Sequence, residues 1–289
     1  MMDWTFWLEW FLKAVIMSLI ILTGFAYLTL YERRALARIQ TRIGPNRAGP
    51  QGILQPIADA VKLIFKEELT PAQAYKLVFV LAPIVTVVPA MVLAAVIPLG
   101  TQFTLPWLSR PIHLYIANIN VGVLYLTAIA SIAVYGIVLA GWSSNNKYAM
   151  LGSMRSTAQM ISYELALGLC FVLAILLGNS MSLVDIVNAQ KNVWFVVLQP
   201  VGALVFLITT LAEVNRAPFD MPEAEQELAA GYHSEYSGMK FALFFMAEYE
   251  KMIVISMIVA TLYFGGYREF PFLQNTVLSA DRTWWLGPI

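Results

Sequence analysis

Residues 212–238 read AEVNRAPFDMPEAEQELAAGYHSEYSG and separate two long apolar runs of the chain. Carboxylates are crowded in this acidic segment, at positions 213, 220, 223, 225, 227 and 235. Charge held this close to hydrocarbon is costly, and it generally serves ions, protons or a protein partner. An ordinary solvated loop is the alternative, and the charges alone do not decide between the two. The flanking apolar runs predict a membrane protein that presents the acidic segment at the bilayer surface.

The composition indicates that lipid is the solvent for most of the chain. Charged residues make up 12% of the 289 positions and hydrophobic residues 59%, whereas soluble domains are about 25% charged. The net charge is zero and no basic patch carries interleaved aromatics, which argues against nucleic acid as a partner. One cysteine, Cys170, and two distant histidines, His113 and His233, are too few for an iron–sulfur cluster, a zinc site or a haem pair. Any iron–sulfur or flavin (FMN) chemistry is therefore expected only in partner subunits.

Six apolar runs, each near the ~20 residues that a bilayer requires, predict an all-α bundle of transmembrane helices in one membrane domain, residues 1–289. The expected spans are 14–31, 77–99, 115–141, 160–178, 193–212 and 241–265. Asp3 and Glu9 precede the first span in place of positive charge, so that span is not a cleavable signal. Pro83 and Pro89 are expected to kink or break the second span, which is tolerated only where neighbouring protein satisfies the freed carbonyl groups.

The distribution of basic residues predicts the topology. The loop 32–76 holds eight of the chain's 18 basic residues, and loops 142–158 and 213–240 hold two each. The intervening loops, 100–114 and 179–192, hold one each. Positive charge accumulates on the cytoplasmic side of membrane proteins. The amino terminus is therefore expected outside, and the acidic segment in the cytoplasm.

One segment of the first basic loop has the pattern of an interfacial helix. Residues 53–66 place Ile53, Ile57, Val61 and Ile64 on one face, with charged residues elsewhere. A helix this short and this charged does not cross a bilayer. We expect it to lie in the plane of the membrane surface.

Three further groups of polar residues are candidates for function. The first span ends in Glu32, Arg33 and Arg34, for which simple interfacial anchoring is the plainer interpretation. The segment 141–164, GWSSNNKYAMLGSMRSTAQMISYE, is interpreted as a polar loop that leads to Glu164 at the start of the fourth span, either a satisfied helix-terminal residue or a proton-handling one.

The third group lies within the sixth span. Glu248 and Lys251 are three positions apart on one helical face and can pair, whereas Glu250 points elsewhere and needs its own partner. Ionisable groups inside a span are functional candidates, with a purely structural pair as the alternative.

Three long strings together resemble one known family. YERRALARIQTRIGPNRAGPQGILQPIADAVKLIFKE (31–67), the segment 141–164 and the acidic segment 212–238 are similar, in the same order, to the quinone-proximal membrane subunit of respiratory complex I. In bacteria this is the H-type subunit of NADH–quinone oxidoreductase, and in mitochondria it is subunit 1 of the enzyme. The resemblance covers nearly all of the sequence.

The resemblance implies a function that the composition does not show. It implies a membrane subunit of a proton-pumping NADH–quinone oxidoreductase, which performs no redox chemistry by itself but helps form the quinone chamber beside the peripheral-arm subunits. Quinone, either ubiquinone or menaquinone, is the implied substrate, and a bacterial inner membrane the implied location. The residues that match the family's basic positions near the chamber are Arg33, Arg34, Arg42 and Arg216. Those that match its proton-coupling carboxylates are Glu164, Glu213, Asp220, Glu223, Glu225, Glu227 and Glu248.

The chain also departs from the family pattern. Ser131 stands where some relatives carry a glutamate in the third span, so a proton path there needs water or another residue. The family continues through two further spans beyond Ile289, which leads us to expect a truncated chain. A membrane-bound hydrogenase-type complex uses a related subunit without quinone, and a stand-alone ion-coupled transporter is a more distant alternative.

Overall fold

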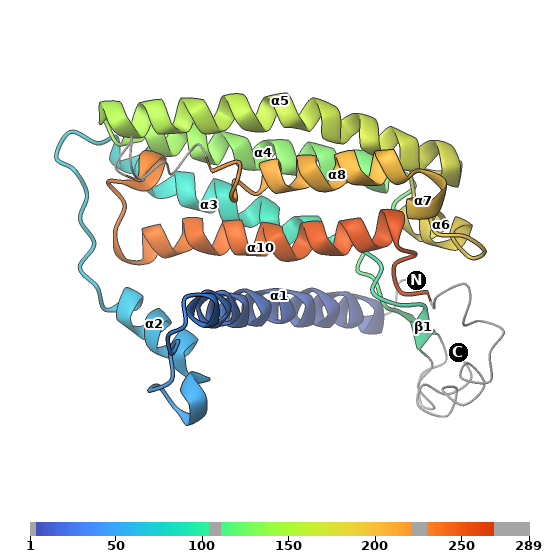
Figure 1. Ribbon diagram of the computed structural model, residues 1–289, viewed down its shortest axis with the longest axis horizontal. Helices are drawn as coiled ribbons and strands as arrows, with labels where there is room; N and C mark the ends of the chain where they lie inside the picture. Colours follow the sequence, from blue (N-terminus) through green and yellow to red (C-terminus); the bar gives the residue numbers. More distant parts are fainter. Residues whose placement is uncertain (1–3, 104–110, 221–229, 269–289) are drawn as a thin grey trace.

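The computed structural model describes residues 4–103, 111–220 and 230–268, and this part of the chain is almost entirely helical (Figure 1). The prediction of an all-α membrane fold is confirmed. The long helices are α1 (Trp4–Ile39), α3 (Lys76–Leu93), α4 (Gly122–Ser143), α5 (Lys147–Gly178), α8 (Pro200–Glu213) and α10 (Gly238–Tyr263). The short helices are α2 (Gln55–Ile64), α6 (Leu183–Ala189) and α7 (Phe195–Leu198), with 3-10 turns η1 (Pro50–Gly52), η2 (Ala94–Val96) and η3 (Gly231–His233). Strands β1 (Gln102–Phe103) and β2 (Ile112–His113) pair antiparallel.

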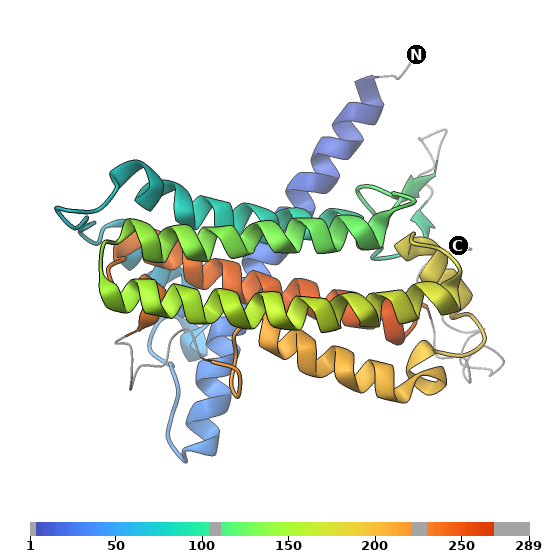
Figure 2. The ribbon, with the colours of Figure 1, turned by 90° about the horizontal axis from the view of Figure 1, so that it is seen from above.

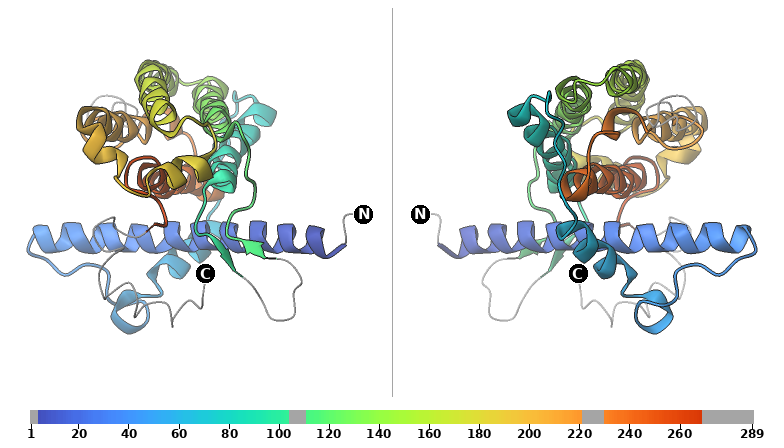
Figure 3. Two further views of the ribbon diagram at one scale, coloured as in Figure 1. Left: turned by 90° about the vertical axis from the view of Figure 1, so that its right-hand side faces the viewer. Right: turned by 90° about the vertical axis from the view of Figure 1, so that its left-hand side faces the viewer.

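Five helices run side by side, and α1 crosses beneath them at an angle (Figures 1 and 2). Seen along the bundle in Figure 3, α1 lies apart from the group formed by α3, α4, α5, α8 and α10. In the described residues, four helices are long and apolar enough to cross a membrane: α1, α3 with η2, α4 and α5. α8 is apolar but shorter, and α10 carries charges within its length. Large apolar side chains cover much of the outer surface, as expected where lipid is the solvent.

The segment 141–164 is helical over most of its length, so the prediction of a polar loop was wrong. The side chain of Asn146 accepts a hydrogen bond from the backbone N–H of Tyr148 and starts α5 at Lys147. Hydroxyl groups then bond back within the helix, as Thr157 does to the carbonyl of Ser153 at 2.7 Å. Glu164 therefore lies in the middle of a 32-residue helix and not at the start of a span.

Three other spans have different bounds from those predicted. The first, predicted as 14–31, is part of α1, which continues to Ile39, so Glu32, Arg33 and Arg34 lie within the helix and not at its end. The third begins at Gly122 and not at 115, because the preceding residues pair with the segment after α3; Leu114 N–H donates to Thr101 at 3.1 Å. The fifth, predicted as 193–212, is divided at Pro200 into α7 and α8. Proline has no N–H and fixes its own backbone, so it begins α8 but does not continue α7.

The second span continues through its first proline without a break. Pro83 leaves the carbonyl of Phe79 without a helical donor, and the hydroxyl of Tyr236 donates to that oxygen at 3.2 Å. The rings of Phe79 and Tyr236 also stack, with centroids 4.0 Å apart. Where α3 packs on α4, Gly136 lets the two helices approach closely, since a Cβ there would collide with the Thr86 hydroxyl.

The three loops predicted to share one side of the membrane contact one another at one end of the bundle. Tyr75 N–H donates to the carbonyl of Ser143 at 3.1 Å, and the Asn146 amide donates to Glu235 at 2.6 Å. Leu69 N–H donates to the Ser237 hydroxyl at 3.0 Å. The placement of these three loops on one side of the bundle thus agrees with the distribution of basic residues. Which compartment this end faces stays a prediction. We call it the loop end of the bundle.

Candidate functional site: a series of buried charges

The shortness of α8 places its last residue inside the bundle. Its 14 residues span ~21 Å at ~1.5 Å per residue, less than the ~30 Å of a bilayer's hydrocarbon core. In Figure 1, α8 ends before α4 and α5 reach the loop end. The side chain of Glu213, at this terminus, is therefore surrounded by helices and is only 5% exposed.

Glu213 is paired with a lysine of α10. The Lys251 ammonium lies 3.6 Å from the Glu213 carboxylate, and Lys251 is also 5% exposed. Burying either charge alone costs several kcal/mol, and the opposite charge offsets much of that cost. Sequence reasoning had Lys251 able to pair with Glu248 on its own helix, but its ion pair in the structure crosses to α8.

A small cavity connects this ion pair to α5. It has a volume of about 40 Å³, and Glu164, Glu213, Lys251, Thr127 and Thr210 are among its lining residues. Its wall is almost entirely apolar, so the charged side chains meet it mainly through their hydrocarbon parts. Glu164 and Glu213, from different helices, thus face a common space.

Ser131 extends the site to α4. Its hydroxyl donates a hydrogen bond to the Glu164 carboxylate across the α4–α5 contact. The position where some relatives are expected to carry a glutamate is therefore occupied by a neutral group that can both donate and accept a hydrogen bond. Polar side chains follow one another here from α4 to α10.

A second group of charges joins α1 to the bundle. Arg216, just after α8, lies 3.4 Å from the Glu32 carboxylate of α1, and the Tyr249 hydroxyl of α10 donates to the other oxygen of Glu32 at 2.6 Å. The Arg216 guanidinium also lies 4.5 Å from the centroid of the Tyr249 ring, within the range of a cation–π interaction. Each of the three side chains therefore contacts the other two.

Arg216 keeps its positive charge in this setting. Burial opposes the charge, but the contact with Tyr249 and the carboxylates of Glu32 and Glu248 outweigh it and raise the pKa of Arg216. Its Nε and Nη2 are buried and have no hydrogen-bond acceptor among the described residues. Arginine donors in that situation favour a carboxylate or a ligand oxygen as their partner.

A side-chain amide of α5 holds the turn between the two groups. Gln159 Nε2 contacts three acceptors: the carbonyl of Ala212 at 2.9 Å, the carbonyl of Phe219 at 2.8 Å and the side chain of Asn215 at 3.3 Å. Asn215 has φ of 54°, a left-handed conformation that asparagine tolerates better than most residues. Glu213 and Arg216 are three positions apart, and this turn directs Glu213 toward Lys251 and Arg216 toward Glu32 of α1.

The other two carboxylates of α10 have different environments. Glu248 accepts a hydrogen bond from the Tyr232 hydroxyl at 2.9 Å. Glu250 is fully buried, and neither of its oxygens has a hydrogen-bond partner among the described residues. Glu250 was expected to point away from Glu248 and Lys251 and to need its own partner, but no hydrogen-bond partner for it is found among the described residues.

Three of the predicted basic residues lie apart from the buried charges, in the first loop. Arg33 pairs with Asp59 of α2 at 2.6 Å, and Arg34 donates to the carbonyl of Gln51. Arg42 Nε donates to the Gln40 side chain at 2.8 Å. Together with Arg38, the side chains of Arg34 and Arg42 line a surface pocket of about 330 Å³. Arg33 and Arg34 thus hold α2 and its preceding loop against the end of α1.

Only part of the acidic segment can be placed. Asp220 is exposed, beyond the turn that Gln159 holds, whereas Glu223, Glu225 and Glu227 lie outside the described residues. His233 is buried in η3, and burial lowers its pKa to about 4, so it is neutral. In the described part of the chain, no group of three His, Cys, Asp or Glu side chains could hold a metal ion.

Sequence reasoning missed several members of the site. Tyr249 and Gln159 were not singled out, and Glu32 was interpreted mainly as an anchor. A signal was present for Tyr249, since it lies between Glu248 and Glu250 and faces the opposite side of α10 from Lys251. Gln159 gave no such signal, because its role depends on how α5 packs against the end of α8.

Comparison with known proteins gives a consistent result along nearly all of the sequence. The model of the NADH dehydrogenase family matches residues 12–287. A relative from Geobacter sulfurreducens, the second H-type subunit of NADH-quinone oxidoreductase in that organism, is 52% identical over 271 residues, which cover 94% of this chain and 82% of the relative. The H-type subunit of the enzyme from Thermomicrobium roseum is 48% identical over 296 aligned positions, which cover 99% of this chain and 84% of the relative. The H-type subunit from Leptospira biflexa is 49% identical over 274 positions, which cover 92% of this chain and 77% of the relative.

Proposed function

Because the chain belongs to the NADH dehydrogenase family, we propose that it is the H-type membrane subunit of a proton-translocating NADH–quinone oxidoreductase. In that complex it helps form the quinone chamber and couples quinone reduction to proton movement. The relatives that share about half of its residues are named as this subunit. The observation that carries the coupling role is the pair Glu213–Lys251 beside the cavity that Glu164 also lines.

The contact between α1 and the bundle favours quinone access at this point. Only 11% of the residues in the apolar window of α1 are buried, which leaves both flanks of the helix open to lipid. Glu32, Arg216 and Tyr249 close the space between α1 and α10. The two Arg216 donors that lack an acceptor in the described residues suit the oxygen of a quinone headgroup, whose isoprenoid tail remains among apolar side chains.

Coupling is then electrostatic. Two-electron reduction makes the quinone oxygens negative until protons arrive, and a new negative charge beside Arg216 competes with Glu32 for that guanidinium. Arg216 and Glu213 are joined by one short turn, and Tyr249 and Lys251 by less than one turn of α10. A shift at the first group therefore changes the field at Glu213 and Lys251. Glu164, across the cavity, is placed to accept or release the proton that responds.

The remaining assignments follow from this function. Quinone is the substrate, either ubiquinone or menaquinone, and the flavin and iron–sulfur centres belong to partner subunits of the peripheral arm. The chain lies in a bacterial inner membrane with its amino terminus outside. The loop end, with Arg33, Arg34 and Arg42 and the acidic segment, faces the cytoplasm and the peripheral arm.

Neutralising Glu213 tests the proposal. In the assembled complex, Glu213→Gln should lower quinone-dependent NADH oxidation and proton pumping by at least about tenfold, because a positioned proton-transfer group is commonly worth about 10²–10⁴-fold. Reduction of an artificial acceptor by the peripheral arm should not change. Asp185→Asn is the matched control, since it neutralises an exposed carboxylate on α6 at the opposite end of the bundle.

Two results would contradict the proposal. Parental turnover and pumping in Glu213→Gln would remove Glu213 from the mechanism. Isolation of the chain in mild detergent with a nickel-containing large subunit, and without NADH-oxidising subunits, would assign it to a hydrogenase-type complex.

A further inference from the structure

Two adjoining cavities lie at the end of α1 that is remote from the buried charges. The inner one, of about 220 Å³, is apolar and lies between α1, the end of α3 and the segment after β2; Met17, Ile20, Ile97 and Leu114 are among its lining residues. The outer one, of about 330 Å³, is lined by Phe6, Glu9, Trp10, Lys13, His113 and Tyr115. Lys13, His113, Tyr115 and Ile116 line both cavities, so the two adjoin, and we call them together the groove.

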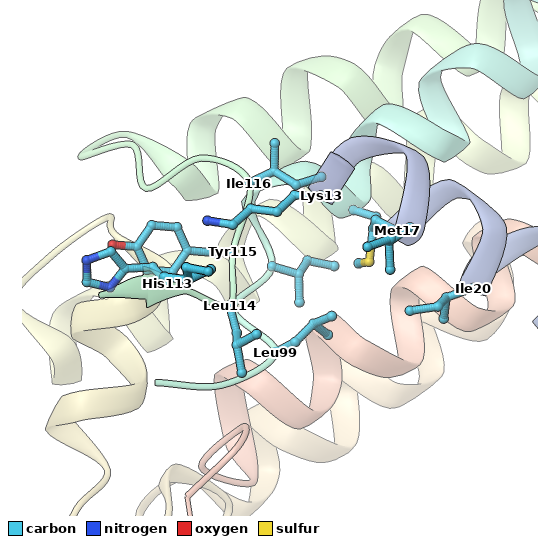
Figure 4. A pocket seen from close by; sticks show the side chains of 12 residues that line it. Lys13, Met17, Ile20, Leu99, His113, Leu114, Tyr115 and Ile116 are labelled. Carbon is cyan, nitrogen blue, oxygen red and sulfur yellow. The ribbon is translucent and has the colours of Figure 1, made fainter. Parts of the chain in front are cut away.

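The polarity of the groove changes along its length. Figure 4 shows the Lys13 ammonium directed toward the rings of Tyr115 and His113, with Met17, Ile20 and Leu99 around the apolar part. Lys13 pairs with Glu9 one helical turn away, at 2.6 Å. The outer part thus holds a positive and a negative group side by side among aromatic rings, and the inner part is hydrocarbon.

The groove fits within one membrane leaflet. From Phe6 to Ile20 the axis of α1 advances ~21 Å; because α1 crosses the bundle at an angle, its rise across the membrane is smaller than that, and one leaflet with its headgroups is ~20–22 Å thick. Trp4, Trp7 and Trp10 are exposed on the outer turns of α1, and such aromatic residues mark the headgroup level. Ile16 and Ile20 on the rim of the inner cavity are about half exposed, so the groove opens sideways toward lipid.

We propose that this groove is a binding site for a zwitterionic phospholipid, with its phosphate at Lys13, its ammonium at Glu9 and an acyl chain in the inner cavity. The adjacent opposite charges of Lys13 and Glu9 complement a headgroup that carries a phosphate followed by an ammonium. An anionic headgroup would meet the Glu9 carboxylate unfavourably, and a quinone has no charge for either group. The bound lipid fills the gap between α1 and the ends of α3 and β2, and so fixes the angle at which α1 crosses the bundle.

Photolabelling in lipid nanodiscs tests the site directly. The purified complex is reconstituted with phosphatidylethanolamine that carries a diazirine on one acyl chain, or with the matching phosphatidylglycerol probe, and labelled peptides are mapped by mass spectrometry. The phosphatidylethanolamine probe should label peptides containing residues 13–20 and 97–116 about threefold more than the phosphatidylglycerol probe, as expected for a single interfacial charge contact.

Two variants separate the groove from the general lipid surface. Ile16 lines the inner cavity and is 54% exposed, whereas Leu19, on the same helix, is 57% exposed and does not line it. Ile16→Trp places a large side chain over the opening of the inner cavity, at a position that is already exposed, and should reduce labelling of the groove peptides about fivefold. Leu19→Trp should change the same labelling by no more than about twofold. Glu9→Gln should abolish the preference for phosphatidylethanolamine, because Lys13 alone favours the anionic probe.

Equal labelling by both probes in the parent protein, or unchanged labelling in Ile16→Trp, would overturn the proposal. Displacement of the label by a short-chain quinone would also overturn it and would assign the groove to quinone. These outcomes do not depend on electron transfer, so they are independent of the result for Glu213→Gln.

Discussion

The ion pair between Glu213 and Lys251 predicts a specific pattern in a double-mutant cycle. Lys251→Met removes the ammonium 3.6 Å from a carboxylate that is 5% exposed. Breaking a buried pair by removing one partner costs ~3–5 kcal/mol, because the remaining charge is left uncompensated. Replacing both partners, as in Glu213→Gln with Lys251→Met, removes both charges, and we expect it to recover most of that loss.

A second ion pair of α10 provides the matched control. Lys240 pairs with Glu68 at 3.1 Å, but the Glu68 side chain is 45% exposed. Partly exposed pairs contribute ~0–1 kcal/mol. In the same cycle, Lys240→Met and Glu68→Gln, alone or together, should therefore dissociate close to the parent.

The measurement is the retention of the chain in the assembled complex during stepwise heating in mild detergent, followed by native mass spectrometry. Because unfolding of such complexes is irreversible, the variants are compared by rank. We expect the double variant to follow the parent closely and Lys251→Met to dissociate first. The double variant should nevertheless fail to pump protons, since it lacks the carboxylate. Parental stability of Lys251→Met would show that the pair is not compensating a buried charge, and pumping by the double variant would show that the carboxylate is not needed.

Three further predictions concern the surroundings of the pair. Tyr249→Phe removes the donor to Glu32, a hydrogen bond to a charged group worth ~1.5–3 kcal/mol; quinone-dependent turnover should fall while artificial-acceptor activity is kept, and equal turnover would exclude Tyr249 from the chamber. Gln159→Leu removes the contacts to Ala212 and Phe219, so amide hydrogen exchange should accelerate at 214–219 but not in α4, and unchanged exchange would contradict the proposed hold on the turn. His233 is buried with its pKa lowered from 6.5 to about 4, so the unfolded chain binds the proton more tightly than the folded chain. The contribution of His233 to the free energy of unfolding should be fully present above pH ~6.5 and fall by up to ~3 kcal/mol toward pH 4. A His233→Asn complex that loses stability over this window as steeply as the parent would refute this assignment.

The helical content of the chain and its apolar outer surface could be predicted from the sequence, because a lipid environment requires both. Within hydrocarbon every backbone group must be satisfied internally, so long apolar runs leave helices as the simplest solution. Helix ends were predicted less well, because local chemistry decides them. Asn146 starts α5 well before the predicted span, and Pro200 divides the fifth span into two pieces. Both signals are present in the sequence, but hydropathy averages over them.

The partners of the buried charges could not be predicted in the same way. Glu213, Lys251 and Glu164 are identified as candidates by their position near or within apolar runs, but pairing depends on how each helix is rotated about its axis. Lys251 could reach Glu248 on its own helix, and the packing of α8 against α10 selects Glu213. Glu32 and Arg216 are distant in sequence, and only the crossing of α1 beneath the bundle brings them together.

The pattern of pairing separates two kinds of carboxylate at the site. Glu32 and Glu213 each lie beside a cation, whose attraction offsets part of the cost of removing a charge from water. Glu164 has a hydroxyl as its partner, and Glu250 has no hydrogen-bond partner, among the described residues. A movement of Arg216 or Lys251 therefore acts directly on the paired acids and reaches Glu164 and Glu250 only through the electric field. If quinone reduction draws Arg216 away from Glu32, the balance at the paired acids changes first, and we propose that the compensating proton moves between Glu213 and Glu164, which line the same cavity.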